Sequence, residues 1–235
     1  MSLKISTSPK KIVKWSIWGV IAVLMLIFIV RVATWEDAYY REKEGSSREE
    51  VITVIGPEEE QQEEELVEEP PTEQQVVEYT VGPTRPRYLT IEKLGVYNAR
   101  ILPMGVNFKG ELDTPRNIFD VGWYESSYAP GEGGTMVIDG HNGGPHVHGV
   151  FKDLPSLADG DIIKIERGDG VVYRYVVVEN ITKPLSESNN YMSTALRSPE
   201  QGRESVTLIS CTGEWSQVQR TYLSRQFVRA VLENN

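Results

Sequence analysis

The chain has 235 residues, 40% of them hydrophobic, and a formal net charge of −10, which is enough for one ordinary domain with extensions. The charge is uneven, because residues 36–83 carry sixteen acidic side chains against three basic ones. No basic run follows the N-terminus, so nucleic-acid binding, which needs a basic footprint, is not expected. The single cysteine, Cys211, excludes an internal disulfide.

The first predicted element is an apolar stretch near the N-terminus. Trp15–Val30 has no charged side chain and with its neighbours approaches the roughly 20 residues that cross a bilayer. We predict a transmembrane signal-anchor helix over residues 12–33, after a cytoplasmic tail over residues 1–11. Lysines precede the stretch and acidic residues follow it, so the rest of the chain is expected outside a cell membrane that is crossed once. The alternative is a cleaved signal peptide, but Arg31 fits poorly in a cleavage site ending at Ala33.

An acidic segment follows, over residues 34–84. It contains EEEQQEEELVEEPPTEQQ, and such dense like charge with few aromatic residues cannot repay the entropy of folding. We therefore predict a disordered linker that acts as a spacer. Weak calcium association of its glutamates is an alternative. No cofactor is expected, and nothing in residues 85–235 indicates that calcium would stimulate an activity.

Residues 85–235 read as one β-rich domain. Short runs rich in Val, Ile and Tyr alternate with Gly, Pro, Asn and Asp, which indicates many short strands in a sandwich or barrel. Helical turns are predicted around Leu154 and within residues 191–203. The predicted strands are Tyr88–Ile91, Ala99–Leu102, Gly133–Ile138, Asp161–Glu166, Val171–Ile181, Val206–Ser210 and Arg225–Leu232.

Cys211 ends one of these strands, in VTLISCTG. A lone cysteine is often only a small buried hydrophobe. A catalytic thiol would need an acid/base group and an oxyanion stabiliser nearby. His141 directly follows the predicted strand that ends at Ile138, whereas His146 and His148 lie in a Gly- and Pro-containing loop where exposure to solvent is expected. Arg225 opens the last strand and suits an oxyanion, although a surface salt bridge is its simpler role.

Four motifs of this chain resemble those of the sortases, the cysteine transpeptidases of Gram-positive surfaces, and they follow one another along the chain in the family's order. "TLISC" is similar to the family's TLxTC, and Gly140-His141 is similar to its GH. Phe151, Leu154, Leu157 and Gly160-Asp161 resemble its F-x-x-L…GD stretch, and Arg225–Ala230 resembles its R-h-h-V-x-A strand. The resemblance covers about residues 85–233. An N-terminal anchor with a stalk is also the family's usual arrangement.

The resemblance implies an all-β fold with short helices, a closed eight-stranded barrel over residues 85–235. It implies that Cys211 attacks an LPxTG-type sorting signal of a surface protein and forms a thioacyl enzyme. His141 would protonate the departing amine, and Arg225 would hold the substrate and the oxyanion. Ser210 and Thr212 would contribute oxyanion or substrate contacts. The acceptor would be an amine of a peptidoglycan precursor or a pilin, with the subclass and the preferred motif left open.

Three other interpretations compete with this one. A metal site built from Asp139, His141, His146 and His148 would make the protein a hydrolase, but the spacing H-x4-H-x-H lacks a helical register. A transpeptidase of the L,D kind carries Ser-x-Gly-Cys, whereas this chain has Leu-Ile-Ser-Cys. A non-enzymatic, membrane-tethered β domain could instead bind cell-wall or surface proteins, with Cys211 merely buried.

Overall fold

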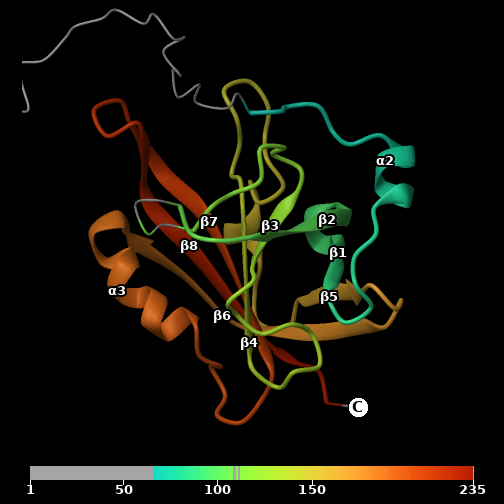
Figure 1. The fold of residues 1–235 in the computed structure, drawn as a ribbon. Coiled ribbons are helices and arrows are strands. Elements are labelled where there is room, and N and C mark those ends of the chain that lie inside the picture. Colours follow the sequence, from blue (N-terminus) through green and yellow to red (C-terminus); the bar gives the residue numbers. More distant parts are fainter. Residues whose placement is uncertain (1–65, 108–109, 111, 235) are drawn as a thin grey trace, which may run out of the picture. The chain divides into compact units, whose positions relative to one another are not determined.

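The computed structural model describes residues 66–107, 110 and 112–234, and Figure 1 shows their fold. Within these residues, eight strands close into a barrel in the order β1-β2-β3-β4-β7-β8-β6-β5. The pairs β2–β3 and β4–β7 are parallel, and the other neighbours are antiparallel. The expected all-β, eight-stranded barrel with short helices is therefore confirmed. The strands are β1 Pro86–Ile91, β2 Val96–Met104, β3 Val121–Tyr124, β4 Thr135–Gly140, β5 Ile162–Arg167, β6 Val172–Pro184, β7 Ser205–Ser216 and β8 Thr221–Leu232. The helices are α2 Glu73–Glu78, α3 Leu185–Ala195, and the 3-10 turns η1 Glu92–Leu94 and η2 Leu154–Ser156.

The seven predicted strands are all present in the barrel, and the predicted helical turn around Leu154 is η2. The sequence did not indicate β3, because its four residues, VGWY, are too few to show an alternating pattern. The helix expected within residues 191–203 is α3, which begins earlier, at Leu185. Its first turns are rich in Ser and Asn, which are weak helix formers, and this hid its start.

Alternate residues of the strands fill the barrel interior, as the two-residue period of a strand requires. Val206 and Leu208 of β7 and Val228 and Ala230 of β8 belong to this buried cluster. Strands from around the barrel contribute to the same cluster. Its other members include Leu89, Ile91, Ile101, Val121, Met136, Ile138, Ile163, Ile165, Tyr175 and Val177.

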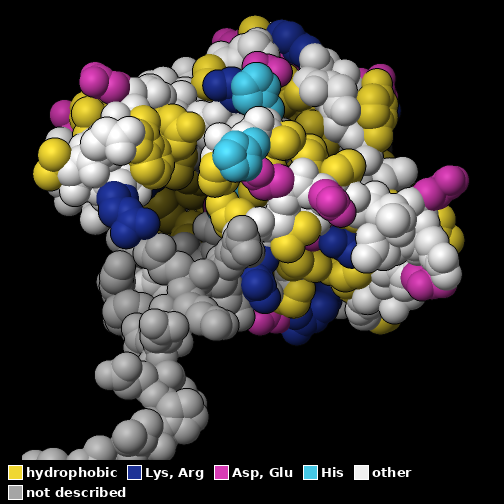
Figure 2. Space-filling view, turned by 90° about the horizontal axis from the view of Figure 1, so that it is seen from above, with side chains coloured by type: hydrophobic (Ala, Val, Ile, Leu, Met, Phe, Trp, Pro, Cys, Tyr) yellow, Lys and Arg dark blue, Asp and Glu magenta, His cyan; other side chains and the backbone are white. Residues whose placement is uncertain are grey.

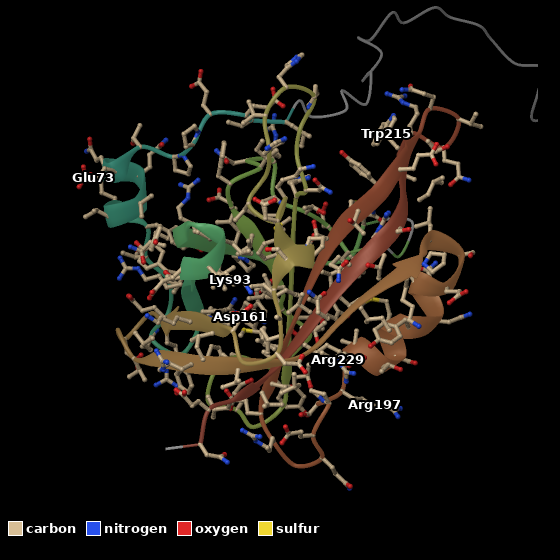
Figure 3. All side chains as sticks on the ribbon, turned by 180° about the vertical axis from the view of Figure 1, so that it is seen from behind. Glu73, Lys93, Asp161, Arg197, Trp215 and Arg229 are labelled. Carbon is tan, nitrogen blue, oxygen red and sulfur yellow. The ribbon has the colours of Figure 1, made fainter. Side chains whose placement is uncertain are left out.

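A second, smaller cluster lies on the outer face of the same sheet, beneath α3. Ile209 and Phe227 are one residue away in sequence from inward-facing positions, so they point outward and pack with Ala195 of the helix. Tyr191 meets the Phe227 ring edge-on at a centroid distance of 4.8 Å. Arg229 fastens the end of the helix, because its guanidinium donates to the main-chain carbonyl of Arg197 at 2.8 Å, and Figure 3 shows these two residues beside each other.

The acidic linker predicted over residues 34–84 is wrong for residues 66–84, which are folded onto the barrel. Thr72 and Gln75 form a reciprocal cap that begins α2. The Tyr79 hydroxyl donates to the carbonyl of Ile101, and the Tyr88 hydroxyl donates to that of Val76. Glutamate and glutamine are good helix formers, and docking against the barrel outweighs the repulsion that composition alone indicated.

The predicted cytoplasmic tail, the signal-anchor helix over residues 12–33 and the linker up to residue 65 lie outside the described residues. In the part of the chain that the structure does describe, no helix combines the length and the hydrophobicity that crossing a bilayer requires.

Candidate active site

Cys211 and Arg225 are cross-strand partners near one end of the barrel. Cys211 lies in β7 on the same outer face as Ile209, and in the antiparallel pair β7–β8 its Cα partner is Arg225. Both side chains are half-buried. One terminal nitrogen of Arg225 donates to the main-chain carbonyls of Tyr222 at 2.9 Å and Ser224 at 3.1 Å, which holds the guanidinium on this part of the strand pair.

His141 is brought to the same end of the barrel by β4. Strands β4 and β7 run parallel, and Gly140 pairs with Ser210, so the next residues, His141 and Cys211, leave the paired region together. The His141 ring is fixed by a hydrogen bond from Nε2 to the carbonyl of Pro115 at 2.8 Å. Since a carbonyl only accepts, Nε2 carries the proton and Nδ1 is the basic nitrogen of the neutral ring.

Burial shifts the pKa values of the Cys211 thiol and of the His141 imidazole. Loss of water raises the pKa of the Cys211 thiol; the Arg225 guanidinium acts in the opposite direction, and the Asp139 carboxylate adds to the rise. Loss of water also lowers the pKa of His141, against the smaller effect of the bond to Pro115. The resting site therefore favours a neutral thiol and a neutral imidazole at pH 7.

Asp139 is a partly buried acid that the sequence presented only as a possible metal ligand. Burial raises its pKa to about 7, although a hydrogen bond with Thr114 acts against the rise. Thr114 and Pro115 are consecutive, so one short segment contacts both Asp139 and His141. No sequence pattern indicated this segment, because it contacts β4 from a loop that precedes β3.

Ser210 and Thr212 are the two expected oxyanion or substrate contacts. Ser210 is 3% exposed, and its hydroxyl donates to the carbonyl of Gly140 at 2.9 Å. Strand alternation turns it toward the opposite face from Cys211, so its geometry fits a structural role and not the expected contact. Thr212 is half-buried and pairs with Ser224 beside the Cys211–Arg225 pair.

The loop after His141 carries the other two histidines, His146 and His148, and both are exposed as predicted. The loop is held from the N-terminal side of the domain, because the Glu68 carboxylate accepts from the main-chain nitrogen of His146 at 2.8 Å. No group of three or more His, Cys, Asp or Glu side chains within the described residues could hold a metal ion.

The surface beside this loop is hollowed. Seen from above, hydrophobic side chains line a hollow next to the cyan histidines, all of which come from the 141–148 segment (Figure 2). On the other side, the β7–β8 hairpin extends beyond Cys211, and Trp215 and Tyr222 form an edge-to-face pair 5.2 Å apart on it. Figure 3 shows Trp215 near the tip of this projection.

Asn142 is a further residue of this region, and no sequence motif indicated it. It is 7% exposed, and its side-chain amide donates to the main-chain carbonyl of Cys211 at 2.8 Å. The loop after His141 is thereby bonded directly to the residue that carries the thiol.

A family model described as the Sortase domain matches residues 89–233. This match covers more than half of the chain, so the chain belongs to the sortase family, a family of cysteine transpeptidases. The family that the sequence motifs resembled is thus confirmed. No curated protein matches the chain.

Solved structures with a similar fold are also sortases. They include the pilus-related sortase C of Group B Streptococcus, at 21% identity over 66% of this chain and 70% of that one, with a TM-score of 0.48. Sortase C of Streptococcus pneumoniae is 21% identical over 66% and 72%, with a TM-score of 0.47. Sortase A of Corynebacterium diphtheriae is 22% identical over 64% and 62%, with a TM-score of 0.45. Family membership rests on the match over residues 89–233.

Proposed function

We propose that this protein is a membrane-anchored cysteine transpeptidase that cleaves an LPxTG-type sorting signal and transfers the acyl part to an amine. The observation that supports this most directly is the convergence of three residues, from β7, from β8 and from the end of β4, near one end of the barrel. Arg225 is the cross-strand partner of Cys211, and His141 leaves the neighbouring strand beside it. A nucleophile, a base and a cation are the groups that acyl transfer through a thioester needs.

In the first half-reaction, the thiol proton of Cys211 passes to Nδ1 of His141 as the sulfur attacks the substrate carbonyl. The guanidinium of Arg225 stabilises the negative oxygen of the tetrahedral intermediate. Collapse breaks the carbon–nitrogen bond, and His141 returns the proton to the leaving amine. The product of this half-reaction is a thioester on Cys211.

In the second half-reaction, His141 takes a proton from the incoming amine as its nitrogen attacks the thioester. Collapse of this intermediate releases the Cys211 sulfur, which recovers the proton, and forms the new amide. Because burial favours the neutral thiol and the neutral imidazole, the ion pair forms only as part of the reaction. The resting thiol is thereby protected from oxidation, which needs thiolate character.

Anchoring and partners belong to the same proposal. The apolar stretch over residues 12–33 would hold the protein in the cell membrane with residues 85–235 outside it. The substrates would be sorting signals of surface proteins, and the acceptor would be an amine of a peptidoglycan precursor or a pilin. No cofactor is assigned a step.

Intact-mass spectrometry of the full-length chain in detergent micelles tests the proposal. The protein is mixed with a panel of LPxTG-type peptides, with and without an amine acceptor. The parent should gain the mass of the acyl fragment, and added amine should release it as a new amide. Cys211→Ala should show neither event, whereas Ser210→Ala, which removes the hydroxyl on the opposite face, should still form the adduct.

If the parent and Cys211→Ala both remain unmodified over the whole panel, the transpeptidase proposal fails. Retention of cell-wall or surface proteins by both forms would then favour a non-enzymatic binding domain.

A further inference from the structure

Asn142 lies beside Cys211 and has no role in the reaction steps proposed above. Strand β4 ends at Gly140, which is paired with Ser210, whereas β7 continues to Ser216. The Cys211 carbonyl therefore lies just past the last residue of β7 that pairs with β4. The Asn142 amide reaches this carbonyl at 2.8 Å and continues the contact between the two chain segments after the strand itself has ended.

The backbone at His141 is consequently tied to β7 on both sides. On one side, the Ser210 hydroxyl donates to the carbonyl of Gly140 at 2.9 Å. On the other, the Asn142 amide donates to the carbonyl of Cys211. The His141 carbonyl itself accepts from the nitrogen of Phe151 at 2.9 Å. These bonds fix the position of the His141 main chain, from which the imidazole extends, relative to Cys211.

The loop that follows is closed onto the same residue. The main-chain carbonyl of Asn142 accepts from the nitrogen of Gly149 at 2.8 Å, and Gly144 donates to the carbonyl of Val147 at 2.9 Å. Asn142 is 7% exposed, so water cannot readily replace its amide at the Cys211 carbonyl. A hydrogen bond from a buried side chain such as this one restrains its partners more than a fully exposed bond does.

We propose that Asn142 is a positioning residue, whose amide holds the His141-bearing loop at the distance from Cys211 that proton transfer requires. This inference rests on the proposed transpeptidase function and deepens it. Asn142 touches the main chain of Cys211 and acts through His141 and the thiol, without a contact to the reacting atoms.

The test uses the full-length protein and three substitutions. Asn142→Ala removes the amide, and Asn142→Asp replaces it with an acceptor of the same shape, which adds a negative charge beside Cys211. Asn142→Gln keeps the amide on a longer arm. Asn180→Ala is the matched control, because the Asn180 amide also donates to main-chain carbonyls, those of Pro155 at 3.1 Å and Leu157 at 2.6 Å.

Two measurements are made over a range of pH. The first is the acylation rate with a sorting peptide, followed by intact mass. The second is alkylation of the thiol by iodoacetamide, which needs no substrate and reports one site, because Cys211 is the only cysteine. A misplaced catalytic group costs up to about 100-fold, so Asn142→Ala should acylate about 10- to 100-fold more slowly, with a smaller change in KM.

The alkylation profiles should distinguish positioning from a merely structural role. Asn142→Asp should move the profile to higher pH, because an added negative charge raises the pKa of the thiol. Asn142→Ala should change the profile as the imidazole moves, and Asn142→Gln should restore part of the parent behaviour. Asn180→Ala should lower the melting temperature and leave both measurements at parent values.

Parent-like acylation and alkylation in Asn142→Ala would overturn the inference, and so would an equal loss in Asn180→Ala. If Asn142→Ala does not fold, Asn142→Asp decides, since parent-like acylation together with an unchanged alkylation profile there would also overturn it. If the parent itself forms no adduct, the proposed function fails, and the alkylation profiles alone judge whether Asn142 positions the thiol and the imidazole.

Discussion

Two rows of residues on the outer face of the barrel use the same strands for different purposes. The first, here called the helix row, comprises Val137 of β4, Thr207 of β7 and Arg229 of β8, which are aligned by strand pairing. The second, here called the thiol row, comprises His141, Cys211 and Arg225 and lies two pleats nearer one end of the barrel.

The helix row is covered. Thr207 is fully buried and donates to the carbonyl of Ala195 at 2.7 Å, and Arg229 is 5% exposed and pairs with Glu179. The thiol row is half-buried and has no helix over it in the contacts described above. Residue type alone therefore does not define a site here. An arginine on the outer face of β8 fastens a helix in one row and lies opposite a thiol in the other.

The largest expected effect comes from replacing the two arginines separately. Arg225→Ala should slow acylation by about 10²–10³-fold, the usual cost of losing one oxyanion donor, with little change in stability. Arg229→Ala should cost about 3 kcal/mol in the free energy of unfolding, because it removes the ion pair with Glu179, which keeps its bond from the Tyr191 hydroxyl, and the bond to the Arg197 carbonyl at the end of α3. Acylation rates and urea unfolding curves measured on both variants check this.

The comparison fails if the effects are exchanged or equal. A folded Arg229→Ala protein that acylates as slowly as Arg225→Ala would mean that the helix row also serves the reaction. Lysine at each position is a useful control, since it keeps the charge and removes the planar set of donors.

A smaller and pH-dependent effect is expected between the two rows, at Asp139, which is aligned with Ile209. Burial raises its pKa from 3.8 to about 7. The folded state therefore holds this proton more tightly, and the stability gained is complete below pH 3.8 and is lost as the pH rises through 7. At pH 8 the ionised, partly buried carboxylate costs up to about 4 kcal/mol relative to acid conditions.

Asp139→Asn should remove this cost. Its free energy of unfolding should exceed that of the parent at pH 8 by up to about 4 kcal/mol, and the difference should shrink toward pH 4. The thiol pKa should also fall, because the Asp139 carboxylate raises it. Equal gains at both pH values would show that the carboxyl does not titrate near 7.

Much of this arrangement was predictable from local patterns. Alternating apolar residues indicated the strands, and the ends of three predicted strands marked His141, Cys211 and Arg225. In the structure only β4 ends there, because the β7–β8 hairpin extends past Cys211 and Arg225, with β7 ending at Ser216 and β8 beginning at Thr221. The strand register was not predictable. It matters here because a slip of one residue in β7 would turn Cys211 to the inner face and Ser210 to the outer face. The composition of the acidic segment indicated mutual repulsion, but it carries no information about the barrel surface against which α2 packs.

The contacts that the sequence did not indicate join segments far apart along the chain. The Asn142 amide reaches the Cys211 carbonyl across 69 positions, and Pro115 reaches His141 across 26. Neither pairing leaves a local pattern, because each residue is ordinary for its own loop. Such long-range contacts orient the side chains of the site, whereas the local patterns indicate only which strands carry them.

The smallest expected effect tests whether the two rows are independent. Thr207→Val keeps the shape of the side chain and suits a strand, but it leaves the carbonyl of Ala195 without its donor. Loss of one such bond should cost about 1 kcal/mol in the free energy of unfolding. Acylation should remain at the parent rate, because Cys211 is four residues further along β7 and belongs to the thiol row. If Thr207→Val instead slows acylation more than about threefold while remaining folded at the assay temperature, then α3 and the thiol are mechanically coupled, and the helix row is part of the site.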